Sequence, residues 1–206
     1  MALFGHPVYR RAALVAVIYR AGLFGSTCLL PLFTQVALGL PASQVGQVLL
    51  PAGLALAITI PLAGRLADRA PLWRTLAIGL LVMAATFAVM AGVGVATAVA
   101  WVTLWAVLGR IGLGLVIPSL SLSATRVLGT PRIAAGAGTM NFMRQLGGAV
   151  GVNAVGIGLE WRLQAHAALG SAGTLRAFHE VFVLMALVTA VAALAAWQMR
   201  PGRGAA

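Results

Sequence analysis

The sequence has very little negative charge and no lysine. Of its 206 residues only three are Asp or Glu, and all 14 basic residues are arginine, which gives a formal net charge of +11. Charged residues make up 8% of the chain, whereas soluble globular domains carry about 25%. This shortage excludes an ordinary soluble domain. The single cysteine, Cys28, also excludes an internal disulfide.

Long apolar runs take the place of the missing charge. Hydrophobic residues make up 61% of the chain and the mean hydropathy is +1.01. A bilayer core needs roughly 20 apolar residues per helix, so the chain has room for about six crossings. The pattern predicts an all-α polytopic membrane protein, with one six-helix domain over residues 1–206. The six predicted spans are Ala12–Val36, Val45–Ala67, Thr75–Gly92, Val99–Leu122, Ala134–Leu159 and Phe178–Met199.

The arginines predict the orientation of these spans. With the N-terminus in the cytoplasm, nine arginines lie inside and two outside, as the positive-inside rule requires. Both ends of the chain are then cytoplasmic. The inside arginines are Arg10, Arg11, Arg65, Arg69, Arg74, Arg126, Arg132, Arg200 and Arg203, and the outside ones are Arg162 and Arg176. We expect the segment from Glu160 to Val181 to be a solvated external loop that carries both glutamates, and the tail from Pro201 to Ala206 to be disordered.

Three arginines lie within predicted spans, where a charge at helix centre costs roughly 2.5–3.5 kcal/mol on insertion scales. They are Arg20, Arg110 and Arg144. Three amide side chains, Asn141, Gln145 and Asn153, share the span of Arg144. We expect no acid at similar depth, because the three acids fall at helix ends or in the external segment. These six polar residues are candidates for a substrate cavity or for proton coupling, and a purely structural role is the alternative.

Glycine is frequent for a chain of helices, with 25 residues. In lipid, small residues let helices approach closely. The predicted packing positions are Gly147, Gly148 and Gly151 in the fifth span, and Gly112, Gly114 and Pro118 in the fourth. Static packing is the simpler interpretation and a sliding contact is the other. Four prolines inside spans, Pro31, Pro51, Pro61 and Pro118, can each kink a helix.

The motifs resemble the carboxyl-terminal half of a major facilitator superfamily transporter. More narrowly, they are similar to the fourteen-helix drug:proton antiporters of the EmrB/QacA subfamily. Four stretches carry the resemblance: residues 22–35, residues 50–69 ending in Gly64-Arg65-Leu66-Ala67-Asp68-Arg69, Gly112-Leu113-Gly114 with Pro118, and residues 135–151 with Asn141-Phe142-Met143-Arg144-Gln145-Leu146-Gly147-Gly148. The loop departs from the superfamily pattern, because Pro71 replaces its second glycine and Arg74 is the only member of the usual basic pair.

The resemblance implies half of an alternating-access transporter built from two inverted three-helix repeats. It implies export of amphipathic small molecules from a bacterial cell across the inner membrane, driven by the proton gradient and without a cofactor or metal. The coupling acids would then lie in a missing amino-terminal half or in a second chain. Arg144 and Gln145 would line or support the cavity.

The resemblance also makes the turn formed by Gly64, Arg65, Asp68, Arg69 and Arg74 a cytoplasmic gating loop. Asp68 would hold the N-terminus of a facing helix. A simple ion pair with Arg65 is the alternative for this carboxylate.

Two other functions compete with the transporter half. A truncated, non-transporting membrane scaffold or regulator is the first. An intramembrane enzyme is the second, but the sequence has no HExxH, Gly-x-Ser-x-Gly or P-loop motif. Nucleic-acid binding is not expected either, because the arginines are scattered among apolar helices rather than gathered in a basic stripe.

Overall fold

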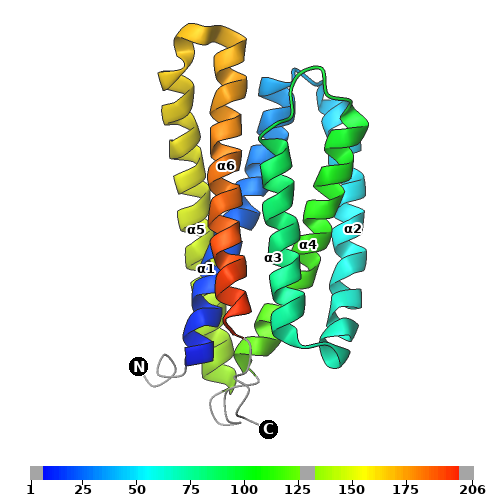
Figure 1. Cartoon of the computed structure of the whole chain (residues 1–206), viewed down its shortest axis with the longest axis vertical. Coiled ribbons are helices and arrows are strands. Elements are labelled where there is room, and N and C mark those ends of the chain that lie inside the picture. Colours follow the sequence, from blue (N-terminus) through cyan, green and yellow to red (C-terminus); the bar gives the residue numbers. More distant parts are fainter. Residues whose placement is uncertain (1–6, 126–132, 200–206) are drawn as a thin grey trace.

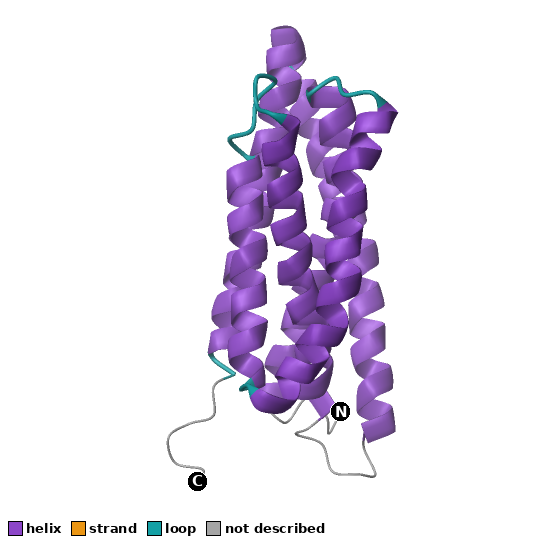
Figure 2. Cartoon of the chain, turned by 90° about the vertical axis from the view of Figure 1, so that its right-hand side faces the viewer, coloured by secondary structure: helices purple, strands orange, loops and turns teal. Residues whose placement is uncertain are grey.

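A computed structural model describes residues 7–125 and 133–199, and this part of the chain is a helical bundle without strands (Figure 2). The six long helices are α1 (Pro7–Leu32), α2 (Ala42–Arg69), α3 (Leu72–Met90), α4 (Val99–Thr125), α5 (Ile133–Ala165) and α6 (Gly170–Trp197). A π-helical turn, η2 (Phe33–Ala37), extends α1, and one 3₁₀ turn, η4 (Ala167–Leu169), joins α5 to α6. Loops lie only at the two ends of the bundle (Figure 2).

Each predicted span falls on one of the six long helices, so the prediction of an all-α polytopic fold is confirmed. Five segments are long and apolar enough to cross a bilayer, and they correspond to α1 with η2, α2, α3, α4 and α6 with η4. The fifth helix, α5, is not among them. Arg144, Gln145 and Asn153 interrupt its apolar sequence.

The helices alternate in direction, which places related ends together. The start of α1, the end of α6, the α2–α3 turn, the end of α4 and the start of α5 lie at the lower end of the bundle in Figure 1. The α1–α2, α3–α4 and α5–α6 connections lie at the other end. The turn that contains Asp68 therefore shares an end with both described extremities of the chain, in the arrangement that the arginine distribution predicts.

The packing pairs relate the first three helices to the last three. The most extensive contacts join α2 to α4, α3 to α4, α1 to α5 and α3 to α6. The first three helices correspond in order to the last three, α1 to α4, α2 to α5 and α3 to α6. Under this correspondence the packing of α2 on α4 is equivalent to the packing of α5 on α1. The corresponding helices α1 and α4 run in opposite directions (Figure 1). This is the pattern of two three-helix repeats of inverted topology.

The expectation of a long external loop is wrong. Helix α5 continues to Ala165, and α6 begins at Gly170, so residues 160–181 form a helical hairpin. The hairpin extends past the neighbouring connections (Figure 1). Gly170 allows the sharp turn because its φ of 58° lies in the left-handed region. Glu180 is consequently a helical residue, and it lies within the candidate membrane span Ala167–Trp197.

Aromatic contacts join η2, the extension of α1, to α6 near the end of the bundle that holds the α5–α6 connection, called the outer end below. Phe33, in the π-turn that follows Pro31, lies 5.6 Å from Phe178 and 5.1 Å from Phe182 between ring centroids. Next to Phe178, Nε2 of His179 donates to the Val93 carbonyl at 2.7 Å, which ties α6 to the α3–α4 connection. Residues 179 and 180 are therefore level with the ends of α3 and α4.

Several predictions fall outside the described residues. These concern Arg126, Arg132, Arg200, Arg203, the break at residues 130–132 and the tail from Pro201 to Ala206. The four prolines predicted inside spans do lie inside helices, Pro31 in α1, Pro51 and Pro61 in α2, and Pro118 in α4.

Candidate functional site

The three arginines predicted within the membrane lie at similar depths in the bundle. At a rise of 1.5 Å per residue, Arg20 is about 20 Å above the start of α1 and Arg144 about 17 Å above the start of α5. Arg110 is about 22 Å above the end of α4, which shares that side of the bundle. All three are partly buried. A hydrocarbon core of about 30 Å places them near its middle.

Arg20 and Arg144 both act on Tyr19 at the interface between α1 and α5. The Tyr19 side chain is hydrogen-bonded to the side chain of Arg20, and it lies within electrostatic range of Arg144. Tyr19 itself is only 1% exposed. The Nε atom of Arg144 is buried and has no hydrogen-bond partner among the described residues. Two guanidinium groups thus share one buried phenol at mid-depth.

Glycines of α5 make this interface unusually close. A β-carbon on Gly147 would lie 2.6 Å from Cα of Val17, and one on Gly151 would meet the backbone of Ala21. Both contacts advance in the same direction along the two helices, so α1 and α5 run parallel. Gly148 is also buried. The predicted small-residue spacing therefore serves packing between two helices of this chain, and whether that contact slides remains a prediction.

Helix α4 makes similarly close contacts on two sides. A β-carbon on Gly112 would lie 2.7 Å from the carbonyl oxygen of Gly79 in α3, and one on Gly114 would lie 2.7 Å from Cβ of Thr59 in α2. Pro118 follows one turn later, and α4 continues past it to Thr125. The glycines let α4 fit between α2 and α3, which makes α4 a central element of its half of the bundle.

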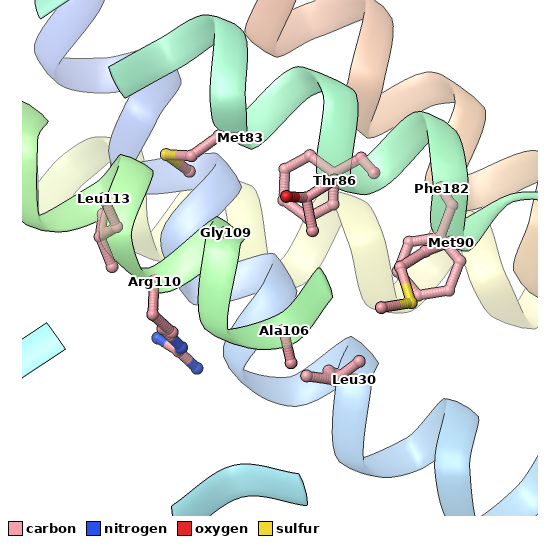
Figure 3. Close-up of a pocket in the computed structure, with 10 residues that line it drawn as sticks. Leu30, Met83, Thr86, Met90, Ala106, Gly109, Arg110, Leu113 and Phe182 are labelled. Atoms are coloured by element: carbon pink, nitrogen blue, oxygen red, sulfur yellow. The ribbon is translucent and has the colours of Figure 1, made fainter. Parts of the chain in front are cut away.

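Arg110 borders a small apolar cavity between α3, α4 and the α1 and α6 helices. Its guanidinium extends away from Met83 and Thr86, on the side of α4 opposite α3 (Figure 3). The cavity volume is about 40 Å³. That is room for a few water molecules, whereas pockets for drug-sized ligands measure about 300–1,000 Å³. The described part of the chain therefore offers no enclosed chamber for a drug at this position.

Two amides of α5, Asn141 and Gln145, lie within one turn of Arg144, and the third, Asn153, lies nine residues further along the helix. Asn141 and Gln145 are one turn apart and both are exposed. Asn153 is also exposed, and its Nδ2 donates to the Ala149 carbonyl at 2.8 Å within the same helix. Arg110 lies in α4 and is not one of the two arginines that act on Tyr19. The structure thus brings Arg144, Asn141 and Gln145 together on one helix and places Arg20 and Arg144 within electrostatic range of the same residue, Tyr19.

The predicted gating loop is a very short turn. Helix α2 ends at Arg69 and α3 begins at Leu72, so only Ala70 and Pro71 connect them. The side chains of Arg65, Asp68, Arg69 and Arg74 are exposed, whereas Gly64 is partly buried. The Arg74 guanidinium lies 5.2 Å from the Trp73 ring centroid, and Trp73 packs edge-on against Trp197 at 5.3 Å. The turn therefore presents its charges to the surroundings while its tryptophan anchors it to α6.

A cluster of charged side chains occupies the outer hairpin. The Glu180 carboxylate contacts Arg162 directly, accepts from Nε2 of His166 at 3.1 Å, and lies 3.5 Å from Nε of Arg176. The Glu180 carboxylate raises the pKa of Arg162, so this guanidinium stays charged. Within residues 7–125 and 133–199, no group of three His, Cys, Asp or Glu side chains is arranged to hold a metal ion.

Two features of these sites are not among those predicted from the sequence. Tyr19 precedes Arg20 directly, so its position beside a membrane arginine was the available signal. The second is the ion cluster of the hairpin, in which Arg162 and Glu180 are 18 residues apart. A pair at that distance becomes visible only once residues 160–181 are known to fold into two helices.

Comparison with known proteins places the chain in a family. Residues 1–152 match the family model described as Major Facilitator Superfamily. The chain is 26% identical over 156 residues to the multidrug transporter protein MdtP of Bacillus subtilis. It is 30% identical over 154 residues to a multidrug resistance protein B homolog of Mycobacterium tuberculosis, and 30% identical over 156 residues to the methylenomycin A resistance protein of Streptomyces coelicolor.

These alignments cover most of this chain but a small part of each relative. They include 76%, 73% and 75% of the chain, against 29%, 28% and 33% of the three relatives in the same order. The chain spans about a third of the length of the curated relatives it matches.

Proposed function

The chain belongs to the major facilitator superfamily, and we propose that it forms part of an efflux transporter for amphipathic small molecules. The family model covers residues 1–152, and two of the relatives carry multidrug in their names. The observation that carries the proposal is the polytopic helical bundle with three arginines at mid-depth. A charge within the membrane is energetically costly, so such residues face a polar path or a partner.

The substrate path lies between this chain and the rest of the transporter. The cavity beside Arg110 has about 40 Å³, which is too small for a drug. The exposed face of α5, with Asn141, Gln145 and the neighbouring Arg144, is the polar surface available to line a shared path. Transport by alternating access would then change which end of that path is open.

Proton coupling requires a titratable group that each side of the membrane reaches in turn. The three acids of this chain are unsuited to that role. Asp68 lies in the last turn of α2, Glu160 near the outer end of α5, and Glu180 is level with the ends of α3 and α4. We therefore assign proton coupling to acids outside this chain, in a preceding half or a second chain, with the proton gradient as the energy source.

Asp68 is suited to act as a latch toward the opposite half. It lies one residue before the end of α2, where the helix dipole favours a cation over a carboxylate. The dipole of its own helix thus disfavours this charge, whereas the positive N-terminus of a facing helix would favour it. We propose that the latch forms on the cytoplasmic side of the bacterial inner membrane, where both ends of the chain also lie.

Efflux measurements test the proposal. The chain is expressed in a drug-hypersensitive bacterium, alone and together with any neighbouring reading frame that encodes further membrane spans. Accumulation of an anionic and of a cationic amphipathic dye, fluorescein and ethidium, is followed with and without a protonophore. We expect protonophore-sensitive efflux from the complete assembly. Arg144→Ala should abolish that efflux while membrane insertion stays at the wild-type level.

A non-transporting scaffold is the competing function, and the same experiment separates the two. A scaffold would insert into the membrane and yet export no ethidium or other amphipathic dye in any pairing. Normal efflux by Arg144→Ala would instead support the transporter function and show that Arg144 takes no part in its mechanism.

A further inference from the structure

The buried junction of α1 and α5 holds Arg20 and Arg144, and Arg144 has a buried donor that no described residue satisfies. Arg144 and Arg20 both act on Tyr19, and Nε of Arg144 is buried with no hydrogen-bond partner among the described residues. A buried donor without a partner costs about 1–3 kcal/mol, and more when it is charged. The arrangement is therefore incomplete until an acceptor of negative charge occupies it.

The acids of the chain are too far away to supply that acceptor. Asp68 lies in the last turn of α2, at the end of the bundle from which Arg144 is about 17 Å distant. Glu160 follows Arg144 by 16 residues on the same helix, which corresponds to about 24 Å. Glu180 is held by Arg162, His166 and Arg176 on the outer hairpin. The chain has no other Asp or Glu.

We propose that Arg144, supported by Arg20, binds the anionic group of an amphipathic substrate, so that the transporter exports organic acids such as carboxylates and sulfonates. The inference rests on the proposed efflux function and names its substrate class. The guanidinium fork pairs with two acceptor oxygens at once, which suits these groups better than it suits a cation or a neutral amine.

The surroundings of Arg144 match such a ligand. Asn141 and Gln145 flank it on the exposed side of α5 and supply amide donors for further oxygen atoms. On the buried side, Tyr19 holds Arg20 in place, because it is 1% exposed and hydrogen-bonded to it. The close contacts of Gly147 with Val17 and of Gly151 with Ala21 fix the spacing of the two helices that carry the arginines. The site is thus rigid at its base and open at its rim.

Binding of two matched probes tests the inference without requiring transport. The full chain in lipid nanodiscs is titrated with pyrenebutyrate and with pyrenebutyl-trimethylammonium, which share their apolar part and differ in the sign of the charge. Quenching of tryptophan fluorescence reports the binding of each probe. We expect the anion to bind at least tenfold more tightly than the cation.

The variants assign that preference to the site. Arg144→Gln should weaken pyrenebutyrate binding at least tenfold and change cation binding less than twofold, which also shows that the variant is folded. Arg144→Lys keeps the charge but lacks the planar guanidinium, so its affinity for pyrenebutyrate should lie between those of the wild type and Arg144→Gln. Arg110→Gln removes an arginine of similar depth that borders the small cavity between α3 and α4, and it should leave the preference for the anion intact.

Three outcomes would overturn the inference. Equal affinity of the wild type for both probes is the first, and an unchanged anion affinity in Arg144→Gln is the second. The third is that the chain binds neither probe selectively while Arg144→Gln weakens its co-purification with a partner half, since a protein carboxylate would then fill the site. Efflux of cations alone would support the proposed efflux function and reject only the anionic substrate class. Selective anion binding without efflux would support the anion site and reject the efflux function.

Discussion

A β-carbon on Gly147 would lie 2.5 Å from the carbonyl oxygen of Val17, so α5 touches the backbone of α1 directly. Gly151 makes the equivalent contact with Ala21 one turn later. Because no side chain separates the helices, they approach closely along this edge, and the arginines on both sides are brought to the same phenol. The junction of α1 and α5 is thus the structural base of the proposed site.

Overpacking of this junction should destabilise the chain. Gly147→Ala adds a methyl group where no space exists, and we expect a loss of about 1–3 kcal/mol. Thermal unfolding in detergent, followed by tryptophan fluorescence, measures the effect. Gly156→Ala is the matched control on the same helix, because nothing lies within 4 Å of a β-carbon there. Equal stability of the two variants would contradict the close contact.

Labelling of single cysteines should fix the orientation of the bundle. Cys28→Ser removes the only native thiol, and Ala70→Cys or Ala167→Cys then introduces one at either end of the bundle. We expect a membrane-impermeant maleimide to label Ala70→Cys only after the cells are opened and Ala167→Cys in intact cells. The reverse result would invert the topology and place the Asp68 turn outside.

Removal of the Glu180 charge should loosen the outer hairpin. In Glu180→Gln, the cations Arg162 and Arg176 lose their shared carboxylate, so hydrogen exchange of the backbone amides in residues 160–180 should become faster. The effect should be modest, because exposed ion pairs contribute little. Glu160→Gln is the control, since Glu160 only accepts from Gln164 at 3.4 Å, and its exchange should stay near that of the wild type.

The bond from His179 to Val93 should contribute to the stability of the outer end. His179→Phe keeps an aromatic ring near Phe33 and leaves the buried Val93 carbonyl without its donor, at a cost of about 1–3 kcal/mol. Thermal unfolding measures the loss. His179→Gln retains a donor and should recover part of it. An unaltered melting temperature in His179→Phe would show that the bond contributes nothing.

The helices could be predicted from the sequence because a long apolar segment in lipid is stable only as a helix in this kind of protein. Within such a run every backbone group must bond internally, so Val45–Ala67 and Val99–Leu122 could be assigned from composition alone. The hairpin at residues 160–181 was misread because charged residues suggested solvent. In fact Arg162 and Glu180 face each other across two helices, and their pairing requires a tertiary arrangement that composition does not encode.

The candidate site was predictable in its residues but not in its grouping. Arg20, Arg110 and Arg144 stand out in the sequence because charge in a membrane helix is costly. Their partners depend on which helices touch. Arg144 meets the Tyr19 pair because Gly147 and Gly151 bring α5 against α1, whereas Arg110 borders a separate cavity on α4.

The connection between α2 and α3 has a mechanical consequence. Ala70 and Pro71 are its only residues, so the ends of these two helices cannot move far apart where Asp68 lies. A pull on Asp68 is passed directly to α3, and through Trp73 and Trp197 to the end of α6. A force on a single carboxylate would thereby reach three helices, one of which, α6, lies far from it in the sequence.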